Sequence, residues 1–269
     1  MKKGDTKLLQ LIQNVLIKET VPGIYIEGKR DYPAIIMAHG IMGSKNEYLN
    51  TLAHIAEVLE KRHIASLRID FAGHGDSKQS LDNFSLSSQV ENLNDAISWM
   101  EGMGYGKFIL LGVSFGAPPC IISTLLNKTV KKTVLIAPVM DYKKTFMNPI
   151  TSWGKEKFGL EKILDGIRTN GLYLDEEYYL SPAVLQDILL VDIPTFLGIV
   201  DKKIIIFHGD TDDMVPYSVS ARVTEENTNI ELVTMINTEH GITEVGDEDF
   251  SRSITRNNLN LVVEYLREE

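Results

Sequence analysis

Short apolar runs rich in β-branched residues alternate with longer amphipathic stretches along most of this chain. The runs are typical of strands and lie at residues 34–38, 64–69, 108–111 and 130–137. The stretches are typical of helices and lie at residues 49–62, at 85–103 and directly after Ser114. A strand–helix–strand order places neighbouring strands parallel and lays helices on both faces of the sheet. The sequence therefore predicts an α/β fold around a mostly parallel central sheet.

The alternation stops between residues 141 and 192, where the chain has aromatic residues but no strongly apolar run. A helical pattern covers residues 155–167, and a second begins at Ser181-Pro182, because proline is well placed in the first turn of a helix. We therefore interpret residues 141–192 as an insertion.

The strand pattern returns at residues 203–207 and 231–236 and is followed by a C-terminal amphipathic helix. A chain of 269 residues that is 43% hydrophobic suits one α/β domain with an insertion. We expect residues 1–140 and 193–269 to form the core, with the insertion as a small lid. Residues 8–27 are expected to form an antiparallel hairpin at the edge of the sheet.

Composition excludes several classes of partner. A net charge of −10 argues against nucleic acid and anionic membranes, because both select clustered lysine and arginine. The single cysteine, Cys120, cannot form an intrachain disulfide and is expected in the core. No apolar run approaches the ~20 residues of a membrane-spanning helix, and no signal-peptide cleavage site follows residues 8–17. We expect a cytoplasmic protein that acts on a small molecule, and a homodimer is compatible with the sequence.

The segment Gly112-Val113-Ser114-Phe115-Gly116 directly follows an apolar strand and precedes a helical stretch. In that context G-x-S-x-G is typical of a nucleophile elbow, a tight turn that exposes the serine at the carboxyl end of the sheet. Small glycines on either side let the flanking backbone approach. The sequence therefore predicts Ser114 as a nucleophile.

A glycine-rich bend, His39-Gly40-Ile41-Met42-Gly43, lies just past the strand at residues 34–38. Such a bend leaves main-chain amides free to point at a carbonyl oxygen. We expect Ile41 N–H and Phe115 N–H to form an oxyanion hole, with His39 supporting the loop.

Three carboxylates, Asp210, Asp212 and Asp213, crowd the loop after the strand at residues 203–207. A carboxylate here can accept a hydrogen bond from an imidazole and stabilise the imidazolium that forms during proton transfer. Asp212 is the first candidate and Asp210 the second. The alternatives are a solvated acidic turn or a metal site with His208. We expect no metal, because no second cluster of ligands is apparent.

His240 follows the last apolar strand and lies beyond the acidic loop in the chain. A serine, acid and histidine in this order are typical of one class of hydrolases, which predicts His240 as the base. His74, in the loop at residues 70–77, precedes Ser114 and is therefore expected to be structural.

These motifs together resemble the α/β-hydrolase superfamily, most closely its feruloyl or cinnamoyl esterase branch, with monoacylglycerol lipases as cousins. Asp212 matches the acid of that family, and the resemblance implies no cofactor. Two departures lie next to the reacting carbonyl. Phe115 stands where those feruloyl esterases carry glutamine, and Ile41 and Met42 replace a more aromatic loop. These two departures affect which acyl groups can bind next to the serine, and they do not affect the fold.

The resemblance also implies a small lid at the place of residues 141–192. Its aromatic residues are expected to include walls of an acyl or aryl pocket, as is Met42. These candidate substrate-binding residues are Trp153, Phe158, Tyr173, Tyr178 and Tyr179.

The sequence thus predicts a serine carboxylic-ester hydrolase that acts through an acyl-enzyme on small to medium acyl or aryl esters. One alternative is a thioesterase or acyltransferase with the same three residues. Another is a binding protein that keeps the fold without activity. Dehalogenase and epoxide-hydrolase chemistry is disfavoured because the elbow carries Ser114 rather than aspartate.

Overall fold

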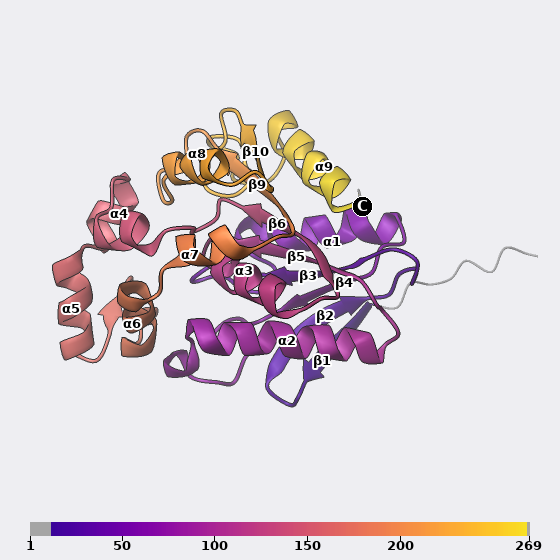
Figure 1. Ribbon diagram of the computed structural model, residues 1–269, viewed down its shortest axis with the longest axis horizontal. Helices are drawn as coiled ribbons and strands as arrows, with labels where there is room; N and C mark the ends of the chain where they lie inside the picture. The colour runs from indigo at the N-terminus through magenta and orange to yellow at the C-terminus, as the bar shows by residue number, and fades with distance from the viewer. Residues whose placement is uncertain (1–11, 268–269) are drawn as a thin grey trace, which may run out of the picture.

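The computed structural model describes residues 12–267, and its centre is an eight-stranded sheet in the order β1-β2-β4-β3-β5-β6-β9-β10 (Figure 1). The strands are β1 (Ile12–Ile17), β2 (Val21–Ile26), β3 (Ala34–Ala38), β4 (Ser66–Ile69), β5 (Phe108–Val113), β6 (Val130–Ile136), β9 (Lys203–Gly209) and β10 (Ile230–Met235). β2 pairs antiparallel with both β1 and β4, and the strands from β4 to β10 run parallel. The predicted mostly parallel sheet is confirmed.

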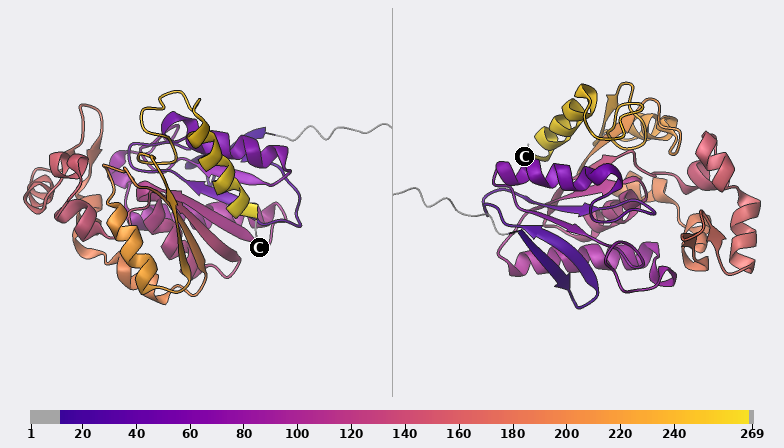
Figure 2. Two further views of the ribbon diagram at one scale, coloured as in Figure 1. Left: turned by 90° about the horizontal axis from the view of Figure 1, so that it is seen from above. Right: turned by 180° about the vertical axis from the view of Figure 1, so that it is seen from behind.

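Helices cover both faces of the sheet, as expected (Figures 1 and 2). One face packs against α2 (Leu86–Gly102), α3 (Ala117–Leu126) and α8 (Tyr217–Glu226), and the other against α1 (Thr51–Lys61) and α9 (Ser253–Arg267). Alternation along β3 explains the two layers, because successive strand residues point to opposite faces. Ile36 joins the core beneath α2 and α3, whereas Ile35 and Met37 join the core beneath α1 and α9.

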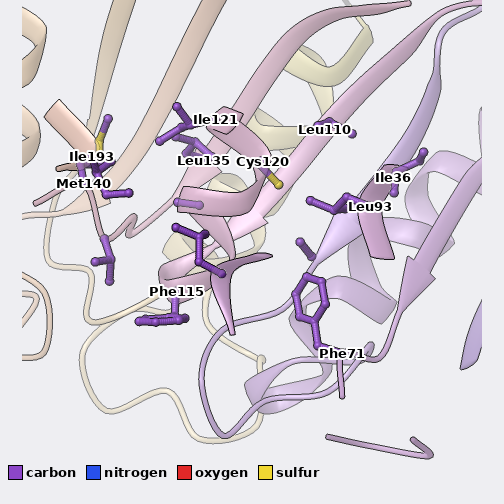
Figure 3. Close-up of a cluster of buried hydrophobic side chains, with 14 of the residues drawn as sticks. Ile36, Phe71, Leu93, Leu110, Phe115, Cys120, Ile121, Leu135, Met140 and Ile193 are labelled. Atoms are coloured by element: carbon purple, nitrogen blue, oxygen red, sulfur yellow. The ribbon is translucent and has the colours of Figure 1, made fainter. Parts of the chain in front are cut away.

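The larger core lies beside the predicted elbow (Figure 3). Leu110 of β5, Leu93 of α2 and Cys120 of α3 are each fully buried there. Cys120 is therefore a core residue, as predicted, and burial raises the pKa of its thiol.

Residues 141–192 form a separate group of short elements to one side of the sheet (left in Figure 1). They comprise a π-helical turn (Lys143–Met147), α4 (Ser152–Lys157), α5 (Leu160–Arg168), the hairpin strands β7 (Leu172–Tyr173) and β8 (Tyr179–Leu180), and α6 (Pro182–Leu190). Helix α7 (Ile193–Ile199) leads back to the sheet. Strand β6 ends at Ile136, shortly before this group begins.

The prediction of a single helix over residues 155–167 is wrong. The chain forms α4 and α5 instead, broken between Phe158 and Gly159. Phe158 is extended and buried, and Gly159 has a φ of 136°, which L side chains rarely adopt. Burial of one ring thus overrides the helical pattern.

The predicted edge hairpin is confirmed for residues 12–26, and residues 8–11 lie outside the described residues. Among residues 12–267, no single helix has the length and apolar composition to cross a membrane. Helices α6 and α7 reach that length and composition only as a pair bent by 58°.

The turn from β5 into α3 requires glycine on both sides of Ser114, because backbone atoms approach where a Cβ would lie. A Cβ on Gly112 would lie 2.7 Å from the carbonyl oxygen of Gly116. A Cβ on Gly116 would lie 2.6 Å from the carbonyl oxygen of His39 and 2.7 Å from that of Ala38. The elbow therefore packs directly against the loop after β3.

We predict that Gly116→Ala lowers the free energy of unfolding by about 1–3 kcal/mol, because the obstructing atoms are backbone and cannot rotate away. Gly102→Ala is the matched control, since a Cβ there meets nothing within 4 Å. It should change stability by less than about 0.5 kcal/mol. Denaturant unfolding of both variants checks this, and equal stability of the two would contradict the packing argument.

Candidate active site

Ser114 occupies the strained position of the elbow. It follows β5 and begins the short 3₁₀ turn Ser114–Gly116, with a φ of 51°. Positive φ in a non-glycine residue is a sparsely populated conformation that concentrates at functional sites. The residue is only 7% exposed, and its hydroxyl has no hydrogen-bond partner among residues 12–267. A buried, unpartnered hydroxyl held in a strained turn is available for a ligand.

The hydroxyl faces a cavity of about 520 Å³. Its walls come from the loops after β3, β5, β9 and β10 and from α4, and are formed by Gly40, Ile41, Met42, Gly43, Ser44, Glu47, Tyr48, Thr51, Val113, Ser114, Trp153, Asp213, Met214, Glu239, His240, Gly241 and Thr243. The carboxyl ends of the parallel strands thus converge on one cavity, which is where α/β sheets bind ligands.

Asp212 and His240 are in contact because β9 and β10 pair in parallel and their following loops meet. His240 Nδ1 donates to Asp212 Oδ2 at 2.8 Å. Asp212 Oδ1 accepts from the amides of Met214 at 2.8 Å and Val215 at 2.9 Å. One oxygen is therefore held by the backbone while the other orients the imidazole and leaves Nε2 free to take a proton.

Asp210, the second candidate acid, binds elsewhere. Its Oδ1 accepts from the amide of Asn237 at 2.7 Å. This contact joins the loops after β9 and β10 without involving the imidazole of His240.

The contact between Asp212 and His240 shifts the pKa of both side chains. Burial alone raises the pKa of Asp212, but charge on His240 and hydrogen bonds from two imidazoles outweigh it, so the pKa of this carboxyl lies well below its usual range. Burial alone lowers the pKa of His240, but the Asp212 carboxylate outweighs it, so the pKa of His240 rises above its ordinary value of 6.5. Asp212 is thus ionised at neutral pH and increases the basicity of the imidazole.

His208 is a second histidine on the same carboxylate, a role that the sequence did not reveal. It is fully buried, with Nε2 3.1 Å from Asp212 Oδ2 and Nδ1 2.8 Å from Ser220 Oγ. Asp212 thereby accepts from two imidazoles and two amides. The described residues contain no group of histidine, cysteine, aspartate or glutamate placed to hold a metal ion.

The loop after β3 contacts Ser114 at Gly40, the residue before Ile41. A Cβ on Gly40 would lie 3.1 Å from Ser114 Cβ, so the loop and the elbow are in contact. The Ile41 amide has no acceptor among the described residues, and Phe115 lies in a first turn, where amides lack intrahelical partners. Both amides remain available for a ligand oxygen.

Glu47 fixes that loop, and no sequence signal pointed to it. Its Oε2 accepts from the Gly40 amide at 2.6 Å, and its Oε1 accepts from the Tyr48 amide at 3.0 Å. Burial raises the pKa of Glu47, with the two amides partly opposing the shift. The carboxylate lines the cavity and belongs to the site.

Only some of the predicted substrate-binding residues line the cavity. Met42 and Trp153 line the cavity. Phe158 packs in the core with its ring 5.3 Å from that of Trp153, and Tyr173 is 68% exposed. Tyr178 Oη lies 2.5 Å from His74 Nε2. Phe158, Tyr173 and Tyr178 are therefore not among the lining residues, nor is Tyr179, whose hydroxyl donates to Asp82 Oδ1 at 2.8 Å.

His39 and His74 support the loops, as expected. His39 Nδ1 donates to the Gly40 carbonyl at 2.7 Å, and its Nε2 accepts from the Phe71 amide at 3.0 Å. His74 Nδ1 donates to the Ala72 carbonyl at 2.8 Å. Burial lowers the pKa of His39 to about 3 and that of His74 to about 4, so both are neutral at pH 7.

We predict that Asp212→Asn lowers the pKa of His240, because the strongest of the carboxylates that oppose the effect of burial is then lost. Asp210→Asn is the matched control and should leave this pKa unchanged, because Asp210 binds the backbone of Asn237. NMR titration of the His240 ring protons measures both. If the pKa of His240 shifts only in the Asp210→Asn variant, then Asp210 rather than Asp212 is the partner of the imidazole.

Solved structures of other proteins superpose on this chain. Est1E from Butyrivibrio proteoclasticus, solved with bound ferulic acid, superposes with a TM-score of 0.73 at 19% identity over 95% of this chain and 96% of that one. The esterase Pf2001 of Pyrococcus furiosus gives a TM-score of 0.66 at 16% identity over 99% of this chain and 95% of that one. At these identities the likeness shows a shared fold.

Relatives with a similar sequence match a smaller part of this chain. Ethanol acetyltransferase 1 of Wickerhamomyces anomalus is 31% identical over 40% of this chain and 26% of its own length. Its counterpart in Kluyveromyces marxianus is 31% identical over 40% of this chain and 31% of its own length. The match thus spans about a quarter to a third of these relatives.

The sequence profile of the alpha/beta hydrolase fold matches residues 33–168, which run from β3 through α5 and include the elbow. With the sheet order, the strained serine and the cavity at the carboxyl ends of the strands, this match shows that the chain belongs to the alpha/beta hydrolase fold family.

Proposed function

We propose that this protein is a serine carboxylic-ester hydrolase in which Ser114, His240 and Asp212 act as a catalytic triad. The observation that carries the proposal is the unpartnered Ser114 hydroxyl in the same cavity as His240, whose Nδ1 is held by Asp212. No hydrogen bond joins Ser114 to His240 among the described residues, and such bonds commonly tighten only when substrate binds.

In the first half-reaction, Ser114 Oγ attacks the ester carbonyl carbon while His240 Nε2 takes the hydroxyl proton. The amides of Ile41 and Phe115 hold the resulting oxyanion. Collapse breaks the bond to the alkoxy group, which leaves as an alcohol with the proton from His240. The product is an acyl-enzyme on Ser114.

In the second half-reaction, His240 takes a proton from water, and the hydroxyl attacks the acyl carbon. Collapse returns the proton to Ser114 and releases the carboxylic acid. His240 acts as a base only when neutral, so turnover declines as pH falls through its raised pKa.

We also propose that residues 141–192 act as a lid over this cavity. Trp153 of α4 lines the cavity, and its amide donates to the Asp213 carbonyl at 3.4 Å. Thr151 Oγ1 donates to the Met214 carbonyl at 3.1 Å. The insertion is thus attached to the loop that carries the acid.

Acyl transfer to an alcohol is a second candidate, favoured by the matches to ethanol acetyltransferases. It uses the same acyl-enzyme, with an alcohol in place of water in the second half-reaction. Ester formation in the presence of ethanol, compared with release of free acid, distinguishes the two.

We predict that Ser114→Ala lowers kcat on p-nitrophenyl esters from acetate to laurate by roughly 10⁴- to 10⁶-fold, because the nucleophile is removed. Ser44→Ala is the matched control, a second serine in the same cavity whose Oγ binds the Asn46 amide, and it is expected to retain turnover.

Release of p-nitrophenol measures both variants, and circular dichroism confirms that they fold. Turnover by folded Ser114→Ala at the wild-type rate would overturn the mechanism. Absence of turnover in the wild type would direct the search to thioesters and to a binding role.

A further inference from the structure

Acidic residues outnumber basic ones in the walls of the cavity, where His240 is the one described lining residue that can become cationic. Three acidic residues, Glu47, Asp213 and Glu239, are among those that line it. The lining residues, all within the described part of the chain, include no lysine and no arginine. A cleft lined by one sign of charge concentrates ligands of the opposite sign and repels those of the same sign.

The cation beside the loop does not offset these charges. Lys45 follows the lining residue Ser44, but its ammonium is buried 2.5 Å from Asp70 Oδ2 and 2.7 Å from Asp76 Oδ2. It is therefore neutralised within the loop at residues 70–77 and does not line the cavity.

The three acidic residues lie in different settings. Glu47 is held in the wall by the Gly40 and Tyr48 amides, so it cannot swing into solvent. Asp213 and Glu239 are exposed lining residues, and Glu239 Oε1 accepts from the Gly246 amide at 3.2 Å. The negative field therefore extends from the rim to the loop beside Ser114.

Two aromatic side chains add a second feature that suits a cation. Tyr48 is 68% exposed, and Trp153 lines the wall formed by α4. The faces of tyrosine and tryptophan attract ammonium groups, most strongly where water is excluded. The aromatic and acidic linings thus favour the same class of ligand.

Resting on the proposed hydrolase function, we infer that this cavity selects esters by charge. It prefers esters that carry an ammonium group over neutral esters of the same shape, and it disfavours anionic esters. The unpartnered hydroxyl of Ser114, buried in the same cavity, marks the point where the ester must lie.

The inference also limits the acyltransferase alternative. A thioester on a phosphorylated carrier brings several negative charges to the rim, where Asp213 and Glu239 repel it. If acyl transfer occurs, a cationic or uncharged ester is the expected donor.

Three butyrate esters of similar size test the inference on the wild-type protein: choline butyrate, neutral 3,3-dimethylbutyl butyrate and anionic 2-sulfoethyl butyrate. Acid release is followed by pH-stat at low and high salt. We expect kcat/KM to fall in that order, with a cation-to-anion ratio on the order of 10-fold or more that shrinks as salt screens the charges.

Charge-removing variants identify the source of the ratio. Asp213→Asn combined with Glu239→Gln should lower the cation-to-neutral ratio several-fold, because shape is kept while charge is lost. Glu101→Gln is the control: Glu101 is exposed at the end of α2, which leads to the amino end of β5, opposite the cavity. It should leave the ratio unchanged.

The outcomes separate the two proposals. Equal or faster turnover of the anionic ester, or a ratio that the double variant does not change, would overturn the charge selection while leaving the hydrolase function intact. Turnover of none of the three esters, or turnover that survives Ser114→Ala, would overturn the hydrolase function itself.

Discussion

The site depends on the junction between β5 and α3, where the chain turns around Ser114. The positive φ of this serine costs about 1–3 kcal/mol and persists only where the surroundings enforce it. Gly112 and Gly116 provide that enforcement, because α3 and the loop after β3 approach closer than a Cβ would permit. The same close packing brings Gly40, the neighbour of Ile41, against Ser114 and Gly116 against the backbone of Ala38 and His39. A single turn thus sets the place of the candidate nucleophile.

The charge of the Asp212 carboxylate is stabilised by hydrogen bonds rather than by solvent. The Asp212 side chain is 0% exposed, yet its pKa is lowered, because amides and imidazoles donate to both oxygens. Burying an ionised carboxylate is costly unless such partners are present. Two imidazoles donate to the carboxylate as well: that of His208, from strand β9, and that of His240, which lines the cavity. The carboxylate therefore has a fixed orientation, and through its hydrogen bond it orients the imidazole of His240, which lines the same cavity as Ser114.

The sequence was sufficient for the features that depend on local pattern. The alternation of elements predicted the sheet and its two helical layers, and the glycines around Ser114 predicted the elbow. Features that depend on tertiary contact were not accessible. Burial of the Phe158 ring ends α4, and Glu47 reaches back seven residues to Gly40. Tyr178 was assigned to the pocket by its residue type alone, whereas its hydroxyl binds His74.

In the proposed mechanism, Ser114 forms the covalent intermediate. The most direct measurement is peptide mass spectrometry of the wild-type protein after reaction with a fluorophosphonate, which forms a stable adduct with an activated serine. We predict one equivalent of phosphonate, located on Ser114, and none on Ser44 in the same cavity. An unmodified Ser114, or an adduct on another residue, would contradict it.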